Sequence, residues 1–101
     1  MDGWTKKYHW QRTWGDERGI DGKPHQDYEG FDGEESIGRI FLDTAGPTKG
    51  LWRWAGGRPD ALRGKSIMPN AGYLPTAAEA ARTVEWYWDG MKARIDIPQR
   101  D

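Results

Sequence analysis

The clearest hydrophobic pattern lies near the C-terminus and predicts a helix over residues 76–95. At 100° per residue, the apolar side chains from Ala77 to Ile95 gather on one face. The opposite face is polar and contains Arg82, Glu85, Asp89 and Lys92. Thr76 followed by Glu79 has the spacing of a capping box, which satisfies backbone N–H groups at the start of a helix. The pattern therefore indicates an amphipathic helix packed on another layer.

Alternating apolar and polar positions upstream predict an antiparallel meander. Residues 27–31 and 36–42 flank Asp32-Gly33, a dipeptide typical of hairpin turns. Residues 44–50 contain Gly and Pro and form a second turn, after which residues 51–55 return as a third strand. We therefore expect an α+β fold: a meander of three or four antiparallel strands with one C-terminal helix packed on one face.

The chain divides into an N-terminal arm, residues 1–25, and a single α+β domain, residues 26–97. In an extended arm, every second side chain from Trp4 to Trp14 shares one side, so the arm can supply an extra strand. Residues 56–75 are expected to be a long connection before the helix, the kind of segment in which binding residues concentrate.

Trp52 and Trp54 flank Arg53 and share one face of the third strand. Two interpretations fit this arrangement: a core beneath the helix, or an exposed surface on which nucleic-acid bases stack. We favour the core, because burying two indoles satisfies the apolar face of the helix. Arg53 then points to solvent beside Arg39 of the neighbouring strand.

Composition is compatible with one small domain. Only 36% of the 101 residues are hydrophobic, but seven Trp, four Tyr and two Phe supply large apolar area. The absence of Cys excludes a disulfide framework and thiolate metal sites. Because no apolar run is long enough for a membrane span, we expect a cytoplasmic protein that does not enter a membrane.

The charge is unevenly distributed. The net charge of −1 argues against strong binding to polyanions. Within residues 44–75, however, Asp60 is the one acidic residue and the basic ones are Lys49, Arg53, Arg58, Arg63 and Lys65. A patch of this kind could bind phosphates or an acidic protein, or be a solvated loop. The candidate nucleic-acid site comprises Arg39, Arg53, Arg58, Arg63 and Lys65, with Tyr8 and Trp10 stacking on bases.

The sequence lacks a pattern that indicates catalysis. Gly64-Lys65-Ser66 resembles the end of a phosphate-binding loop, but position 59 is Pro where that motif requires Gly. His9 and His25 are the only histidines, without a spacing that would aim two nitrogens at one metal ion. We therefore expect no enzymatic activity, cofactor or metal.

Trp86 projects about 160° away from Trp88 around the helix, onto the polar face. Two alternatives explain an indole in that position. Either the N-terminal arm covers Trp86, or Trp86 anchors a partner, as Trp often does at interfaces. Together with Arg58 and Arg63 it forms the expected protein-binding site.

Three segments resemble short, uncharacterised bacterial proteins: Ile37-Gly38-Arg39-Ile40-Phe41, Gly50-Leu51-Trp52-Arg53-Trp54 and Thr76-Ala-Ala-Glu-Ala-Ala81. The resemblance covers residues 27–94 and implies a Gly-Arg-Ile hairpin, a Trp-x-Trp strand and a Thr-x-x-Glu-Ala-Ala helix, without an activity. A fainter likeness is to the arm-binding domains of phage-type integrases, in which three strands precede one helix and the sheet enters a DNA groove. Those domains are typically basic, and this chain is not.

The function expected from these features is that of a small non-enzymatic binding module. A protein-interaction adaptor or inhibitor, of the kind carried by mobile elements, agrees with the near-zero charge and with Trp86. The alternative is a nucleic-acid-binding module that uses the basic residues between positions 39 and 65.

Overall fold

The computed structural model describes residues 6–15, 17–18, 22, 25–57 and 70–96, with backbone alone for residues 94–96. Its elements in chain order are β1 (His9–Arg12), β2 (Asp27–Asp32), β3 (Glu35–Leu42), the 3-10 turn η1 (Gly46–Thr48), β4 (Trp52–Gly56), β5 (Ala71–Leu74) and α1 (Ala77–Asp96). Arg58, Arg63 and Lys65 lie outside the described residues.

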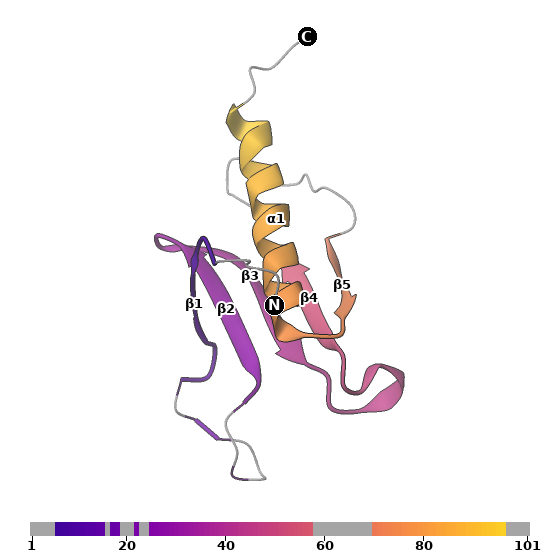
Figure 1. The fold of residues 1–101 in the computed structure, drawn as a ribbon. Coiled ribbons are helices and arrows are strands. Elements are labelled where there is room, and N and C mark those ends of the chain that lie inside the picture. The colour runs from indigo at the N-terminus through magenta and orange to yellow at the C-terminus, as the bar shows by residue number, and fades with distance from the viewer. Residues whose placement is uncertain (1–5, 16, 19–21, 23–24, 58–69, 97–101) are drawn as a thin grey trace.

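The strands form one antiparallel sheet in the order β1-β2-β3-β4-β5, so each strand pairs with the next one along the chain. Helix α1 packs across β3, β4 and β5 on one face of this sheet (Figure 1). The predicted α+β class is confirmed. The predicted number of strands is wrong, because the described residues contain five.

The strand that the sequence did not indicate is β5, which lies inside the predicted connection 56–75. Its four residues pair with β4, from Trp52 opposite Leu74 to Ala55 opposite Ala71. Glycine at position 72 weakens the sequence signal for a strand. It is required here because a Cβ would lie 2.9 Å from the Trp54 indole nitrogen. Pairing with β4 thus explains a strand that the local sequence does not predict, and the contact with Trp54 explains the glycine within it.

A bulge in the β2–β3 hairpin places Ile37 in the core. The register shifts between Gly30 and Phe31, which pair with Gly38 and Ser36 and leave Ile37 as the extra residue. Ile37 has no exposed surface. Gly38 has φ +144°, a conformation that suits glycine, and it lies against the backbone of Ala55.

The Thr76 cap of α1 is confirmed, whereas the Glu79 carboxylate bonds to the Thr76 hydroxyl and not to the backbone N–H that a full capping box would use. The Thr76 hydroxyl accepts a 3.1 Å hydrogen bond from the Glu79 backbone N–H and donates one of 2.9 Å to the Glu79 carboxylate. Trp54 is buried at 5% exposure, and its ring contacts Tyr87 at a centroid distance of 5.9 Å. Trp52 is partly buried, packs against the same core and stacks on Tyr28. The Trp-Arg-Trp strand therefore contributes to the core.

The predicted faces of α1 need one correction. Most of the predicted apolar positions are buried, and Tyr87 joins them at 2% exposure. Glu85, predicted to face solvent, is also only 2% exposed. It is buried because the N-terminal arm lies against it. No helix among the described residues is long and apolar enough to span a membrane.

Candidate interaction surface

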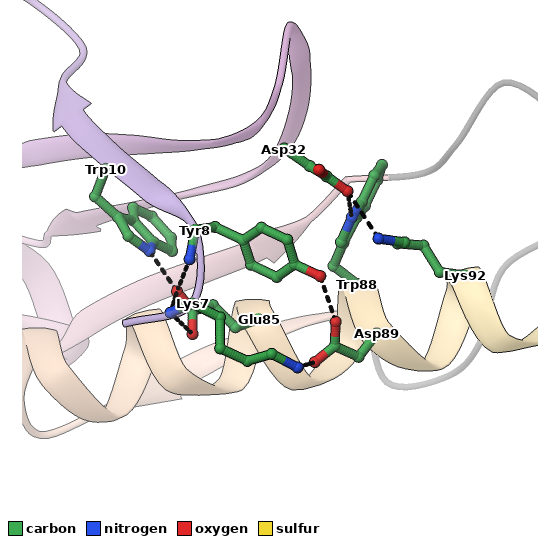
Figure 2. Close-up of polar contacts among 8 residues, drawn as sticks. All are labelled: Lys7, Tyr8, Trp10, Asp32, Glu85, Trp88, Asp89 and Lys92. Carbon is green, nitrogen blue, oxygen red and sulfur yellow. Dashed lines mark hydrogen bonds and ion pairs between the residues drawn. The ribbon is translucent and has the colours of Figure 1, made fainter. Parts of the chain in front are cut away.

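The N-terminal strap, defined here as residues 6–12, docks on α1 through the buried carboxylate of Glu85 (Figure 2). The backbone N–H groups of Lys7 and Tyr8 donate to this carboxylate at 3.2 Å, and the Trp10 indole N–H donates at 2.9 Å. These donors replace the water that the carboxylate loses on burial. Tyr8 and Trp10 therefore face the helix.

Asp89, one turn after Glu85, holds the side chains of the strap. It accepts hydrogen bonds from the Lys7 ammonium group at 2.6 Å and from the Tyr8 hydroxyl. Burial by itself raises the pKa of Asp89, but the hydrogen bonds from Lys7 and Tyr8 outweigh it and hold that pKa below its ordinary value. The pKa of Tyr8 is raised, first by burial and then by its bond to Asp89.

Asp32, at the end of β2, connects the hairpin to the same region of α1. It accepts bonds of 3.0 Å from the Trp88 indole N–H and from the Lys92 ammonium group (Figure 2). These two bonds lower the pKa of Asp32. Among the described residues no buried side-chain nitrogen or oxygen lacks a hydrogen-bond partner. The carboxylates of Asp32, Glu85 and Asp89 thus have a structural role: they hold the strap, the β2–β3 hairpin and α1 together.

The opposite face of the sheet is not covered by any helix of the described chain, and we call it the open face. Strand alternation places Arg39 and Phe41 of β3, Arg53 of β4 and Tyr73 of β5 there, because their neighbours Ile40 and Trp54 are buried on the helix side. Register sets Phe41, Arg53 and Tyr73 side by side across three strands.

Arg39 is fixed on the open face by Asp27. Its guanidinium makes two hydrogen bonds with the Asp27 carboxylate, the one from Nε being 2.8 Å long. Thr13 and the Trp14 indole N–H donate to the same carboxylate at 2.7 and 3.0 Å. Burial alone raises the pKa of Asp27, but these hydrogen bonds, led by that from Arg39, hold it below its ordinary value. Arg39 is therefore preorganised and its charge is offset.

Arg53 lies between two aromatic rings. Its guanidinium carbon is 5.6 Å from the centre of the Tyr73 ring, and its Nη1 donates a long 3.4 Å bond to the Tyr73 hydroxyl. On the next strand, the guanidinium of Arg39 lies 5.3 Å from the Phe41 ring. We call Trp14, Arg39, Phe41, Arg53 and Tyr73 the open-face cluster, in which cations and aromatic rings alternate.

Three large hydrophobic side chains of the described chain are exposed. Tyr73, 40% exposed, and Trp14, 46% exposed, belong to the open-face cluster. Trp86 is 64% exposed on the side of α1 that faces away from the sheet. The described part of the arm contacts Glu85 and leaves Trp86 uncovered, so the alternative in which the arm covers Trp86 is wrong for that part.

The residues of the predicted nucleic-acid site separate in the structure. Arg39 and Arg53 share the open face, whereas Tyr8 and Trp10 lie on the helix side and bond to Asp89 and Glu85. Sequence reasoning missed Trp14, Phe41 and Tyr73 as the aromatic neighbours of the two arginines. Phe41 could have been found, because it lies two positions from Arg39 in one strand and therefore shares its face.

The described residues include no group of three or more acidic, His or Cys side chains arranged to hold a metal ion. No protein-family model matches the chain, and neither the curated proteins nor the solved structures contain a match.

Proposed function

We propose that this protein is a small non-enzymatic protein-interaction module whose partner contacts the open face of the sheet. The observation that carries the proposal is the open-face cluster, in which Arg39 and Arg53 alternate with Phe41, Tyr73 and Trp14 on a face that no helix of the described residues covers. Tyr, Trp and Arg are the residue types most enriched at the energetic centres of protein interfaces.

The charge balance of this face favours a protein over a polyanion. Arg39 and Arg53 are accompanied by Asp27 and Glu29, and Asp27 bonds directly to Arg39. Binding of a nucleic acid depends mainly on cations that neutralise phosphates. A protein partner needs instead rigid aromatic area and a few directed polar contacts, which Tyr73 and Arg53 provide. Such a module has the role of an adaptor or an inhibitor.

Single-stranded nucleic acid is the second candidate ligand. The stacked pairs Arg39–Phe41 and Arg53–Tyr73 favour it, because bases stack on aromatic rings and on guanidinium planes. If nucleic acid is the ligand, Phe41 and Tyr73 stack on its bases, which is the role that the sequence suggested for Tyr8 and Trp10.

The test is affinity capture from an extract of the cells in which the protein occurs naturally, with wild type and two open-face variants, Tyr73→Ala and Arg53→Gln. Both side chains are at the surface, so the variants are expected to fold. We expect a partner that wild type retains and both variants lose. Glu34→Ala, at an exposed turn position, is the control and should retain that partner. Trp86→Ala tests separately whether this exposed indole contributes to the same interface.

Two outcomes would contradict the proposal. Equal capture by wild type and the open-face variants would exclude this face as the contact. Recovery of nucleic acid, with binding that falls steeply between 50 and 200 mM salt (roughly the range over which phosphate contacts weaken), would favour the second candidate.

A further inference from the structure

An apolar groove of about 260 Å³ lies on the helix side of the sheet, at the start of α1. Trp10 and Tyr28 line it from the sheet, and the methyl groups of Ala77, Ala78 and Ala81 line it from the helix. The buried side chain of Ile40 also contributes, and Lys6 is the charged residue among the described residues that line the groove. Because Tyr28 and Trp10 face α1, the groove is separate from the open face.

The groove results from a taper in side-chain size along α1. Towards the C-terminus, Trp88 and Met91 are each 1% exposed and fill the space above the sheet. In the first turns alanines take the equivalent positions, and a methyl group does not reach the aromatic side chains of β1 and β2. Apolar surface therefore remains accessible between the two layers.

The aromatic side chains of the groove are held in place before any ligand arrives. The Trp10 indole is fixed by its 2.9 Å bond to Glu85. The Tyr28 ring stacks on Trp52 at a centroid distance of 6.2 Å and an interplanar angle of 28°, an arrangement in which offset aromatic rings attract each other. A ligand that enters this groove does not need to order these side chains, which lowers the cost of binding.

The charge at the groove determines which charged group of a ligand can bind there. Lys6 is exposed and takes part in none of the ion pairs among the described residues, whereas Lys7 is paired with Asp89. Glu85 is near, but this residue is 2% exposed and its carboxylate already accepts hydrogen bonds from the strap. Among the described residues at the groove, the accessible charge is therefore positive.

We propose that the groove binds a small apolar carboxylate, whose hydrocarbon body lies between Trp10 and Ala78 and whose carboxylate pairs with Lys6. The groove volume of about 260 Å³ is slightly below the usual range for drug-sized ligands, which suits a smaller body of about ten non-hydrogen atoms. This site is independent of the proposed function, because it uses none of the open-face residues.

The test is an NMR titration of the amide and indole resonances with three probes that share one chain: octanoate, octan-1-ol and octylamine. We expect octanoate to shift the resonances of Trp10, Ala77, Ala78 and Ala81 saturably, with roughly millimolar affinity. Octanol should bind severalfold more weakly and octylamine more weakly still. The open-face resonances of Arg53 and Tyr73 serve as the internal control and should not move.

Two variants separate the apolar and the charged contributions. Lys6→Gln, at an exposed position, should remove the preference for octanoate over octanol while octanol binding persists. Ala78→Leu should fill the groove and abolish binding of all three probes, with an unchanged thermal melt showing that it folds.

The proposal is overturned if no probe produces saturable shifts at the groove, or if octanoate and octanol bind equally to wild type. Shifts of equal size at the groove and at the open face would mean non-specific association and would overturn it too. Should Ala78→Leu fail to fold, the comparison of wild type with Lys6→Gln still decides the question.

Discussion

The indole N–H of Trp10 donates a 2.9 Å hydrogen bond to the carboxylate of Glu85, joining β1 to α1 across 75 positions of the chain. Glu85 is almost fully buried, so this donor and the backbone N–H groups of Lys7 and Tyr8 supply the hydrogen bonds that water would otherwise make to its carboxylate. The strap and the helix therefore stabilise each other: without the strap the carboxylate would return to water, and without Glu85 the strap would lose its central acceptor.

We predict that Glu85→Ala lowers the free energy of unfolding by about 2–3 kcal/mol, because three partly buried N–H donors of the strap lose their acceptor. Glu85→Gln, which keeps one carbonyl oxygen, should cost less. Urea unfolding followed by circular dichroism measures both. Glu34→Ala, at an exposed turn position, is the control and should change stability by less than about 0.5 kcal/mol. Equal effects of Glu85→Ala and Glu34→Ala would contradict the role of the buried carboxylate.

The two tryptophans Trp54 and Trp86 should respond oppositely to truncation. Trp54 is 5% exposed in the core, so Trp54→Ala should destabilise the protein by about 3–5 kcal/mol. Trp86 is 64% exposed, and Trp86→Ala should stay within about 0.5 kcal/mol of wild type. Chemical denaturation of the two variants under identical conditions gives the comparison. A large loss for Trp86→Ala would show that this indole packs against part of the protein.

Stability should fall in acid. The pKa values of Asp27, Asp32 and Asp89 are all lowered in the folded protein. A carboxyl group with a lowered folded pKa contributes stability above its unfolded pKa, and this contribution is lost as pH falls through the folded pKa. The free energy of unfolding should therefore decrease below about pH 4, near the ordinary pKa of Asp.

Asp27→Asn isolates one part of this pH dependence. The variant should show a shallower decline between pH 5 and pH 2 than wild type (about the range over which Asp titrates), because residue 27 no longer takes up a proton. Urea unfolding at several pH values measures the slope. Glu35→Gln, at an exposed position, provides the comparison. If Asp27→Asn and wild type decline in parallel, the Arg39–Asp27 pair does not contribute as described.

Gly38→Ala should be more damaging than Gly33→Ala. At position 38 a Cβ would lie 2.5 Å from the Ala55 carbonyl oxygen and 2.8 Å from a Val84 methyl carbon, with φ at +144°. We expect a loss of about 2–4 kcal/mol from backbone strain and steric overlap together. Gly33 also has a positive φ, +64°, but a Cβ there meets no atom within 4 Å, so the expected loss is about 1 kcal/mol. Thermal melts rank the two variants, and the reverse order would contradict the hairpin geometry.

The sequence predicts the elements whose signals are local. The Thr76–Glu79 capping box marks the start of α1, and Asp32-Gly33 marks the β2–β3 turn, because each depends on residues within one turn of the chain. The inward orientation of Trp52 and Trp54 follows from alternation and the need to cover an apolar helix. The class of fold follows from these elements alone.

Contacts between residues far apart in the chain determine the features that the sequence did not predict. Glu85 has the helical position of a solvent-facing residue, and only the docked strap makes it a buried acceptor. The four residues of β5 form a strand because they pair with β4. This pairing also places Tyr73 opposite Arg53. The helical period, the strand alternation and the turn dipeptides are properties of neighbouring residues, so the chain displays them directly. Which face stays uncovered, and which side chains meet there, depends on contacts between residues far apart in the chain, and these exist only once the layers have packed.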